Sequence, residues 1–290
     1  MNKMSYPKTI KIYLVDGKAD GIKTAELSNW VGKAIVIPRN KLKNVKERPE
    51  CNQPSVYFLF SKEDEESVLP NVYIGEAEIL WKRLVSHESG KDFWQIAIGF
   101  VSKDNNLTKA HIKYLESRCL NISKSISRCV LRNTTESTLP TLSEPGISEM
   151  EEYLNNLKLL LSSLGYPILQ ESTPKKDKED GQLFYCKGKG AIGNGKMTNE
   201  GFIVYKGSTA STQISDAVRK RNERLLSSLI QSGHIDKISE KLFKFEKDYI
   251  FNTPSAASDL ITGNSTSGWV MWKTKQSKTL REIEQEKLKS

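Results

Sequence analysis

The chain of 290 residues has little of what marks secreted, membrane-bound or zinc-binding proteins. It contains four cysteines and three histidines, and the spacing of Cys51, Cys119, Cys129 and Cys186 fits no zinc motif. Reduced thiols inside the fold are the preferred interpretation. No apolar run approaches the roughly 18 residues of a membrane span, and residues 1–11 lack the apolar segment of a signal peptide. We therefore expect a cytoplasmic protein with no membrane partner.

Acidic residues are also scarce relative to basic ones. Lys and Arg total 44 against 35 Asp and Glu, a formal net charge of +9. A surplus of this size suits a polyanionic partner such as DNA, because each neutralised phosphate releases a counterion. It does not identify the partner, since many basic proteins bind no nucleic acid. With 37% hydrophobic residues, the chain has the composition of a globular protein.

Hydrophobic periodicity predicts an α+β fold of two domains with additional segments. The boundaries we expect are a β-rich extension over residues 1–50, a first domain over 51–148, a helix and polar linker over 149–181, and a second α+β domain over 182–290.

The predicted elements alternate in type within each domain. Strands are expected at residues 10–14, 33–38, 56–60, 72–74, 93–101, 183–186 and 202–205, and helices at 76–87, 109–120, 149–164, 214–230 and 279–288. Thr108 is placed to cap the helix that follows it. The Gly-rich stretch 188–195 lacks the Gly-Lys-Ser/Thr ending of a nucleotide loop, so a hairpin loop is expected there.

An ordered set of polar residues in the first domain forms the candidate catalytic site. Tyr57 and Tyr73 would lie on neighbouring strands, and Gly75 would let the chain turn sharply into the next helix. Arg83 and His87 are four residues apart, so they share one face of that helix. Taken singly, each is more often packing or solvated surface.

Together with Glu116 on a separate helix, these residue types suit phosphodiester cleavage. Arginine binds phosphate through two hydrogen bonds, a carboxylate can hold a divalent ion, and tyrosine or histidine can relay a proton.

The motifs Ser55-Val56-Tyr57 and Tyr73-Ile74-Gly75, followed by Arg83, His87 and Glu116, resemble the core of the GIY-YIG nucleases. The resemblance implies a small antiparallel sheet flanked by helices. It also implies that Glu116 binds Mg²⁺ or Mn²⁺, that a tyrosine, with Tyr57 as the candidate, activates water, and that Arg83 binds the phosphate. Tyr73, His87 and Asn133, which matches the asparagine near the domain's end, complete the catalytic set that the resemblance implies.

Two further features belong to this resemblance. The family usually has glycine where Ser55 stands, so a positive φ there would alter the strand and impair activity. Residues 9–39 are similar to an extension that precedes the nuclease motif in a bacterial subgroup, and we interpret them as a structural cover over the sheet.

The C-terminal region is similar to the DUF4357 module, and to the RAMA module of restriction-modification enzymes. The likeness lies in 202–207, 254–258, Gly263, Gly268-Trp269 and Trp272-Lys273. It implies a DNA-reading role, for which the candidate contacts are Arg219, Lys220, Arg221, Arg224, Trp269 and Lys273. The alternative is that at least one tryptophan fills the core and that the basic helix face is only solvated.

These observations predict a divalent-metal-dependent DNA endonuclease, with restriction or defence as a possible setting. One site per chain cuts one strand, so double-strand cleavage requires a dimer on DNA or two encounters. The alternative function is a catalytically degenerate DNA-binding adaptor. Convergence of Tyr57, Tyr73, Arg83 and Glu116 on one cleft favours the enzyme, whereas a cleft blocked by Ser55 or by the acidic stretch 63–66 favours the adaptor.

Overall fold

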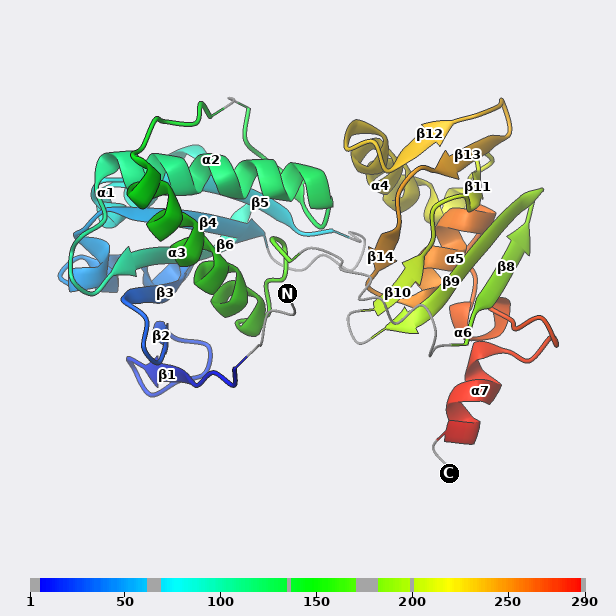
Figure 1. The fold of residues 1–290 in the computed structure, drawn as a ribbon, viewed down its shortest axis with the longest axis horizontal. Helices are drawn as coiled ribbons and strands as arrows, with labels where there is room; N and C mark the ends of the chain where they lie inside the picture. The colour runs from blue at the N-terminus through cyan, green and yellow to red at the C-terminus, as the bar shows by residue number, and fades with distance from the viewer. Residues whose placement is uncertain (1–5, 62–68, 135–136, 171–181, 199–200, 288–290) are drawn as a thin grey trace. The chain divides into compact units, whose positions relative to one another are not determined.

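The computed structural model describes residues 6–61, 69–134, 137–170, 182–198 and 201–287. The described residues up to 170 form one compact unit, and those from 182 onward form another (Figure 1). Each unit combines sheets with helices, so the fold class is α+β, as predicted. Within the described ranges, no helix is both long and apolar enough to cross a membrane. The predicted linker at 171–181 and the acidic stretch 63–66 lie outside these ranges.

The first unit is built on a seven-stranded sheet with the order β1-β2-β3-β6-β4-β5-β7. Neighbouring strands are antiparallel, except that β5 and β7 are parallel. The strands are β1 (Ile10–Leu14), β2 (Lys23–Leu27), β3 (Gly32–Pro38), β4 (Ser55–Ser61), β5 (Asn71–Ala77), β6 (Trp94–Ser102) and β7 (Val130–Leu131).

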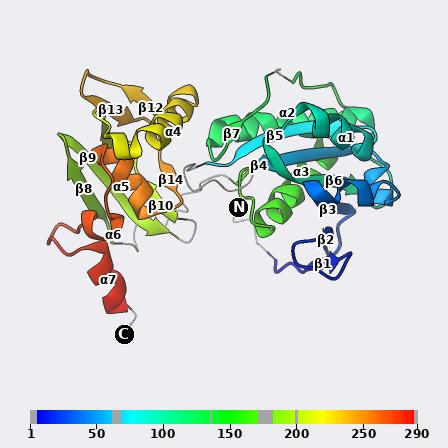
Figure 2. The same ribbon diagram turned by 180° about the vertical axis from the view of Figure 1, so that it is seen from behind.

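Helices cover both faces of this sheet (Figures 1 and 2). On one face lie α2 (Lys109–Ile126) and α3 (Glu144–Ser163), and on the other lie α1 (Leu80–Gly90) and the 3₁₀ helices η1 (Arg39–Val45) and η2 (Pro49–Cys51). Phe58 of β4 packs into the α2 and α3 side, whereas Tyr57 packs into the α1 side. Because both faces are covered, β4 is apolar along its length rather than alternating with polar residues.

The N-terminal strands belong to the same sheet as the tyrosine motifs. β3 pairs with β6 along its whole length, from Gly32 opposite Ser102 to Pro38 opposite Ile96. Residues 10–38 therefore extend the sheet sideways. The interpretation of this segment as a cover over the sheet is wrong. Met150 of α3 lies in the core of the same unit, so the boundaries predicted at residues 50 and 148 both fall inside it. Periodicity predicted five of the seven strands, all except β2 and β7, but not which strand each one pairs with.

The helix predicted after Thr108 is present and longer than expected. Thr108 Oγ1 accepts a hydrogen bond from the His111 amide at 3.3 Å, which satisfies a free N–H group of the first turn. The helix continues to Ile126 and ends at Ser127, whose φ is 57°. Glu116 therefore lies in the middle of α2.

The second unit contains two small antiparallel sheets and several helices. One sheet has the order β14-β10-β9-β8 and the other β11-β13-β12. The elements are β8 (Phe184–Gly188), β9 (Ala191–Thr198), β10 (Gly201–Val204), β11 (Thr209–Ser211), η3 (Asp216–Val218), α4 (Arg219–Gln231), β12 (Ile235–Lys237), β13 (Leu242–Phe245), β14 (Tyr249–Phe251), α5 (Pro254–Thr262), α6 (Gly268–Met271) and α7 (Leu280–Lys287).

The Gly-rich stretch forms a hairpin, as predicted. Lys189 and Gly190 connect β8 to β9, and both have positive φ, 48° and 79°, which is the pattern of a two-residue type I′ turn. A Cβ on Gly193 would lie 3.0 Å from the Ile261 side chain. The absence of a side chain there lets α5 approach the sheet closely.

Candidate functional site

Tyr57 lies at the centre of the first unit, between two glycines on the neighbouring strands. In register it faces Gly75 of β5 and Gly99 of β6. A Cβ on Gly75 would stand 2.5 Å from the Tyr57 hydroxyl oxygen, so Gly75 provides the space that the phenol ring occupies. Its φ is not positive and β5 continues to Ala77. The prediction that Gly75 turns the chain out of the strand is therefore wrong.

The Tyr57 hydroxyl joins two side chains of α1. Its oxygen lies 2.6 Å from His87 Nε2 and accepts a hydrogen bond from Arg83 Nε at 3.3 Å. Because a guanidinium can only donate hydrogen bonds, the Tyr57 hydroxyl can use its own hydrogen for a hydrogen bond to His87. Arg83 and His87 thus share one helix face, as their spacing predicted, and both meet Tyr57.

Burial sets the protonation state of this group. It lowers the pKa of His87 to about 4, with smaller contributions from the positive charges of Arg83 and Lys91. Burial also raises the pKa of Tyr57 well above its usual value, and the neighbouring Tyr73 adds to this effect. At neutral pH the pair is therefore a neutral imidazole that accepts a hydrogen bond from a neutral phenol.

Tyr73 extends the cluster toward solvent. Its ring centroid lies 6.2 Å from that of Tyr57 and 5.1 Å from that of His87. The Lys91 ammonium lies 4.2 Å from the centre of the Tyr73 ring, within cation–π range. Tyr57 is fully buried, whereas Tyr73 is half-buried. The four motif residues Tyr57, Tyr73, Arg83 and His87 are therefore brought together.

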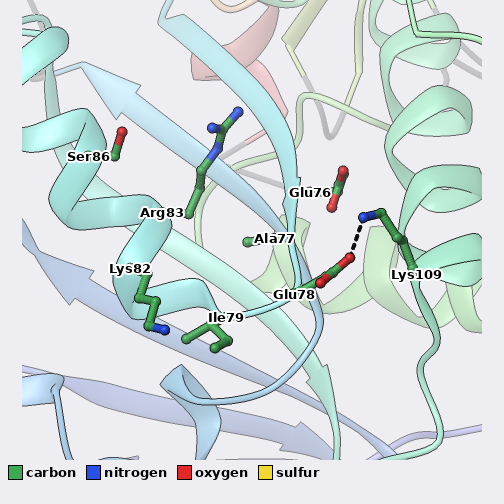
Figure 3. Close-up of a pocket in the computed structure, with 8 residues that line it drawn as sticks. All are labelled: Glu76, Ala77, Glu78, Ile79, Lys82, Arg83, Ser86 and Lys109. Atoms are coloured by element: carbon green, nitrogen blue, oxygen red, sulfur yellow. Dashed lines mark ion pairs between the residues drawn. The ribbon is translucent and has the colours of Figure 1, made fainter.

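A cavity of about 490 Å³ lies beside Arg83. Figure 3 shows Arg83 of α1 and Glu76 of β5 on its wall, with an ion pair between Glu78 and Lys109 at one side. The lining residues are Glu76, Ala77, Glu78, Ile79, Lys82, Arg83, Ser86 and Lys109. β7 pairs only with the first two residues of β5, so the β5 edge beside this cavity has no neighbouring strand in the described chain.

Glu116 reaches this region from α2, on the other face of the sheet. It is half-buried, and Ser137 Oγ donates a hydrogen bond to its Oε2 at 3.0 Å. Burial raises the pKa of Glu116, the Ser137 bond opposes that rise, and the nearby charge of Glu76 adds to it. Arg83 is close enough to oppose it as well. Glu116 does not line the cavity, but it lies within the electrostatic range of two residues that do.

The donor set around Glu116 suits a hard divalent ion held mainly by water. No group of three histidine, cysteine, aspartate or glutamate side chains gathers in the described ranges, and Glu116 forms no ion pair with any described residue. Mg²⁺ commonly uses one or two carboxylates and keeps several waters. Glu116, with Glu76 as a carboxylate neighbour, fits that requirement. The positive charge of such an ion would oppose the effects of burial and of the Glu76 charge, which both raise the pKa of Glu116.

Asn133 binds the backbone of β5 instead of facing the cavity. Its Nδ2 donates to the Ile74 carbonyl at 2.7 Å, and its Oδ1 accepts from the Ile74 amide at 3.0 Å. Both polar atoms of the Asn133 side chain are therefore hydrogen-bonded to the backbone of Ile74, which lies between Tyr73 and Gly75. In the structure Asn133 positions β5, whereas the resemblance implied a catalytic role for it.

Ser55 causes no strain in β4. It lies in the strand opposite Ala77, its φ is not positive, and it is fully buried. Serine therefore replaces the usual glycine without a conformational cost. The Ser55 hydroxyl has no hydrogen-bond partner among the described residues.

Two of the predicted DNA contacts on α4 are paired with acidic residues. Arg219 pairs with Asp216 at 2.8 Å, and Arg221 pairs with the buried Asp259. The prediction that Arg221 is available to phosphate is therefore corrected, since its charge is already satisfied inside the unit. Lys220 and Arg224 are exposed.

The two tryptophans of the second unit have different environments. Trp272 is fully buried, stacks on Phe202 at 4.3 Å and donates to the Pro254 carbonyl at 2.8 Å. Trp269 is 37% exposed, and Lys273 is exposed. α4 packs on β12 and η3, whereas α6 packs on α5, α7 and β8, so the two groups of candidate contacts rest on different elements.

The cysteines contribute no exposed thiol. All four are buried and free, and burial raises the pKa of Cys51, Cys129 and Cys186 to about 12. They are therefore protonated, weakly reactive side chains at neutral pH.

Comparison with known families identifies the second unit. Residues 184–284 match the family described as Domain of unknown function (DUF4357). The match covers about a third of the chain and contains β8 through most of α7. No curated protein and no solved structure matches the chain. The exposed Trp269 and Lys273 and the buried Trp272 all lie within the DUF4357 domain.

The site holds two residues that sequence reasoning missed, Lys91 and Glu76. The available signal for Lys91 was its spacing, because Arg83, His87 and Lys91 follow one another at intervals of four. Lys91 follows the last helical residue and has an extended backbone, so the predicted helix end at residue 87 concealed it. Glu76 was missed as well, because the motif reading stopped at Gly75.

Proposed function

We propose that the chain is a GIY-YIG-type endonuclease that hydrolyses DNA phosphodiester bonds with the help of Mg²⁺ or Mn²⁺. The observation that carries the proposal is the hydrogen-bonded group of Tyr57, His87 and Arg83, beside a cavity that Arg83 and Glu76 share. The contact between a tyrosine of a buried strand and two basic residues of an amphipathic helix supports the proposal.

In this proposal the buried residues orient the exposed ones. Tyr57 fixes the Arg83 guanidinium, which binds the scissile phosphate from the cavity wall. Because its pKa is raised, Tyr57 stays protonated, so it serves as an orienting group and not as the base that the family resemblance implied. Tyr73 retains solvent access and is the tyrosine placed to contact the attacking water. A divalent ion on Glu116 would stabilise charge on the phosphate and on the leaving oxygen.

The DUF4357 domain is proposed to bind DNA beside the cut. Arg224, Trp269 and Lys273 are exposed and supply a cation, a stacking surface and a second cation. The similarity of this region to the RAMA module supports a response to modified bases. Digestion of methylated and unmethylated copies of one plasmid measures that response.

The test of the nuclease is cleavage of supercoiled plasmid with Mg²⁺ and with Mn²⁺. We expect Glu116→Gln to lower the cleavage rate at least about 100-fold, because the variant removes the carboxylate that would hold the ion. The thermal unfolding temperature should stay within error, since a half-buried glutamate without an ion pair contributes little to stability.

Glu152→Gln is the matched control, because Glu152 is an exposed glutamate of α3 in the same unit. Its cleavage rate should equal that of the wild type. An unchanged rate in Glu116→Gln would refute the site assignment.

One observation favours the DNA-binding adaptor as a second candidate. Tyr57 is fully buried and Glu116 does not line the cavity, which is an arrangement that could bind DNA without cutting it. Salt-sensitive DNA binding with no cleavage by the wild type under either metal would select the adaptor.

A further inference from the structure

A line of basic side chains runs along α1 next to the two tyrosines. Arg83, His87 and Lys91 follow at intervals of four, which places them along one side of the helix and its end. Arg83 meets the Tyr57 hydroxyl, and Lys91 lies over the Tyr73 ring. His87 lies between them and is neutral. The line therefore presents two positive charges, each resting on a different tyrosine.

Lys91 is a half-buried cation without a carboxylate partner. Among the described residues it forms no ion pair. The adjacent acidic residue, Asp92, lies 3.8 Å from Arg39 and is almost fully exposed. A lysine held against an aromatic ring with no counter-ion is suited to receive an anion from outside the protein.

The segment that carries Lys91 is fixed by Arg39. Arg39 Nη2 donates to the Glu88 carbonyl at 2.8 Å, and Nη1 donates to the carbonyls of Lys91 and Trp94 at 3.0 and 3.1 Å. The guanidinium also lies 4.9 Å from the centre of the Trp94 ring. These carbonyls belong to the end of α1 and to the segment that leads into β6, where helical hydrogen bonds are missing. Arg39 thus supplies the bonds that hold Lys91 in place.

We propose that Lys91 binds the DNA phosphate adjacent to the scissile one, and that Arg39 is the positioning residue for Lys91. The proposal rests on the nuclease function proposed above and names a further contact for its substrate. It also gives residues 32–51 a role, because η1 begins at Arg39 and follows directly from β3. That segment would align the substrate strand.

The neighbouring phosphate follows from the separation of the two cations. Positions eight residues apart lie roughly 12 Å apart along a helix axis. The two side chains are also directed to different rings, whose centroids are 6.2 Å apart. In the proposal the two cations bind successive phosphates of one strand, because each is held at a different tyrosine. Lys91 should therefore matter more for an oligonucleotide than for a small phosphodiester.

The first measurement is equilibrium binding of a short duplex at several salt concentrations, with Glu116→Gln as the background so that cleavage does not interfere. We expect Lys91→Gln to reduce the slope of log K against log salt by about one, the value for a single lost phosphate contact. Lys91→Arg should restore the slope. Lys11→Gln, at an exposed position of β1, is the matched control and should leave it unchanged. A slope in Lys91→Gln equal to that of the background would overturn the proposal.

The second measurement is hydrolysis of bis(p-nitrophenyl) phosphate and of a duplex, each by wild type and Lys91→Gln. We expect Lys91→Gln to lower kcat/KM on the duplex by about tenfold more than it lowers the rate on the small ester. Equal losses on both substrates would place Lys91 on the scissile phosphate and overturn the proposal. If the wild type hydrolyses neither substrate, the proposed function fails, and the binding measurement still decides whether Lys91 contacts phosphate.

The role of Arg39 is tested by non-additivity. Because Arg39 acts through Lys91, the double variant Arg39→Gln/Lys91→Gln should bind the duplex no more weakly than Lys91→Gln alone. Additive losses would show that Arg39 acts independently of Lys91. Arg39→Lys, which keeps the charge but cannot reach three carbonyls, serves if Arg39→Gln does not fold. Arg39→Lys should bind the duplex more weakly than the wild type, and wild-type binding by Arg39→Lys would overturn the positioning role.

Discussion

Helix α1, with Lys91 directly after it, and helix α4 both carry basic residues, but these residues have different partners. On α4, Arg219 and Arg221 are each matched by an aspartate, from the preceding turn and from α5. On α1 and at its end, Arg83 and Lys91 have no carboxylate partner among the described residues and rest on tyrosines instead. A run of basic residues in a sequence therefore indicates positive charge, but it does not show whether those side chains are available to bind a ligand. Availability depends on which acidic residues the fold brings near.

A similar contrast separates a buried acidic residue of the DUF4357 domain from two residues of the first unit. In the DUF4357 domain, Asp259 is engaged by several neighbours. Asp259 accepts from Arg221 and from the Thr266 amide and hydroxyl, and its backbone carbonyl accepts from Asn222. In the first unit, Glu116 and Lys91 keep charge in half-buried positions without an ion-pair partner among the described residues. Unsatisfied charge of this kind is expected where a ligand supplies the missing partner.

The largest effect expected within this comparison is at Trp272. Trp272→Ala should destabilise the DUF4357 domain by about 3–5 kcal/mol, because it empties a fully buried site and removes the hydrogen bond to Pro254. Trp269→Ala should change stability by less than about 0.5 kcal/mol while weakening DNA binding. Urea unfolding and duplex binding measure the two effects. Equal losses of stability would show that Trp269 also belongs to the core.

The two buried histidines should make both units sensitive to acid. His87 and His234 each have a pKa lowered from about 6.5 to about 4. Between these values the unfolded chain binds a proton that the folded chain does not, so stability falls as pH drops from about 6.5 to about 4, by up to roughly 3 kcal/mol for each histidine.

Hydrogen exchange of each unit at pH 7 and pH 4.5, read by mass spectrometry, separates the two histidines. His234→Gln should reduce the acid sensitivity of the DUF4357 domain alone, and His87→Gln that of the first unit alone. If either variant retains the full acid sensitivity of its unit, the lowered pKa of that histidine is not the cause.

A smaller effect on stability is expected at Arg221. Arg221→Met leaves Asp259 buried without its cation, which should cost about 2–3 kcal/mol, less than for a fully buried pair because Arg221 is 29% exposed. Arg83→Met should leave stability nearly unchanged but lower DNA cleavage. Thermal unfolding and plasmid digestion provide the two readouts. Preserved stability in Arg221→Met, together with weaker DNA binding, would reverse our comparison of α1 with α4.

Local structure was largely predictable from the sequence, because it depends on neighbouring residues. The apolar run beginning at Val56, the cap at Thr108 and the turn at Gly190 each produced the expected strand, helix or hairpin. Strand partners were not predictable, since the pairing of β3 with β6 depends on residues about 60 positions apart. The four motif residues were found from their order, whereas Lys91 and Asp259 take their roles from contacts that periodicity does not encode.

The pairing of β3 with β6 has a consequence for synthesis on the ribosome. β3 is complete at Pro38, but its partner strand is not finished until Ser102. At about 5–20 residues per second, the first three strands wait several seconds for the strand that joins them to the tyrosine motifs. We expect the nascent chain to expose an apolar strand edge during that interval and to be a chaperone client until β6 emerges.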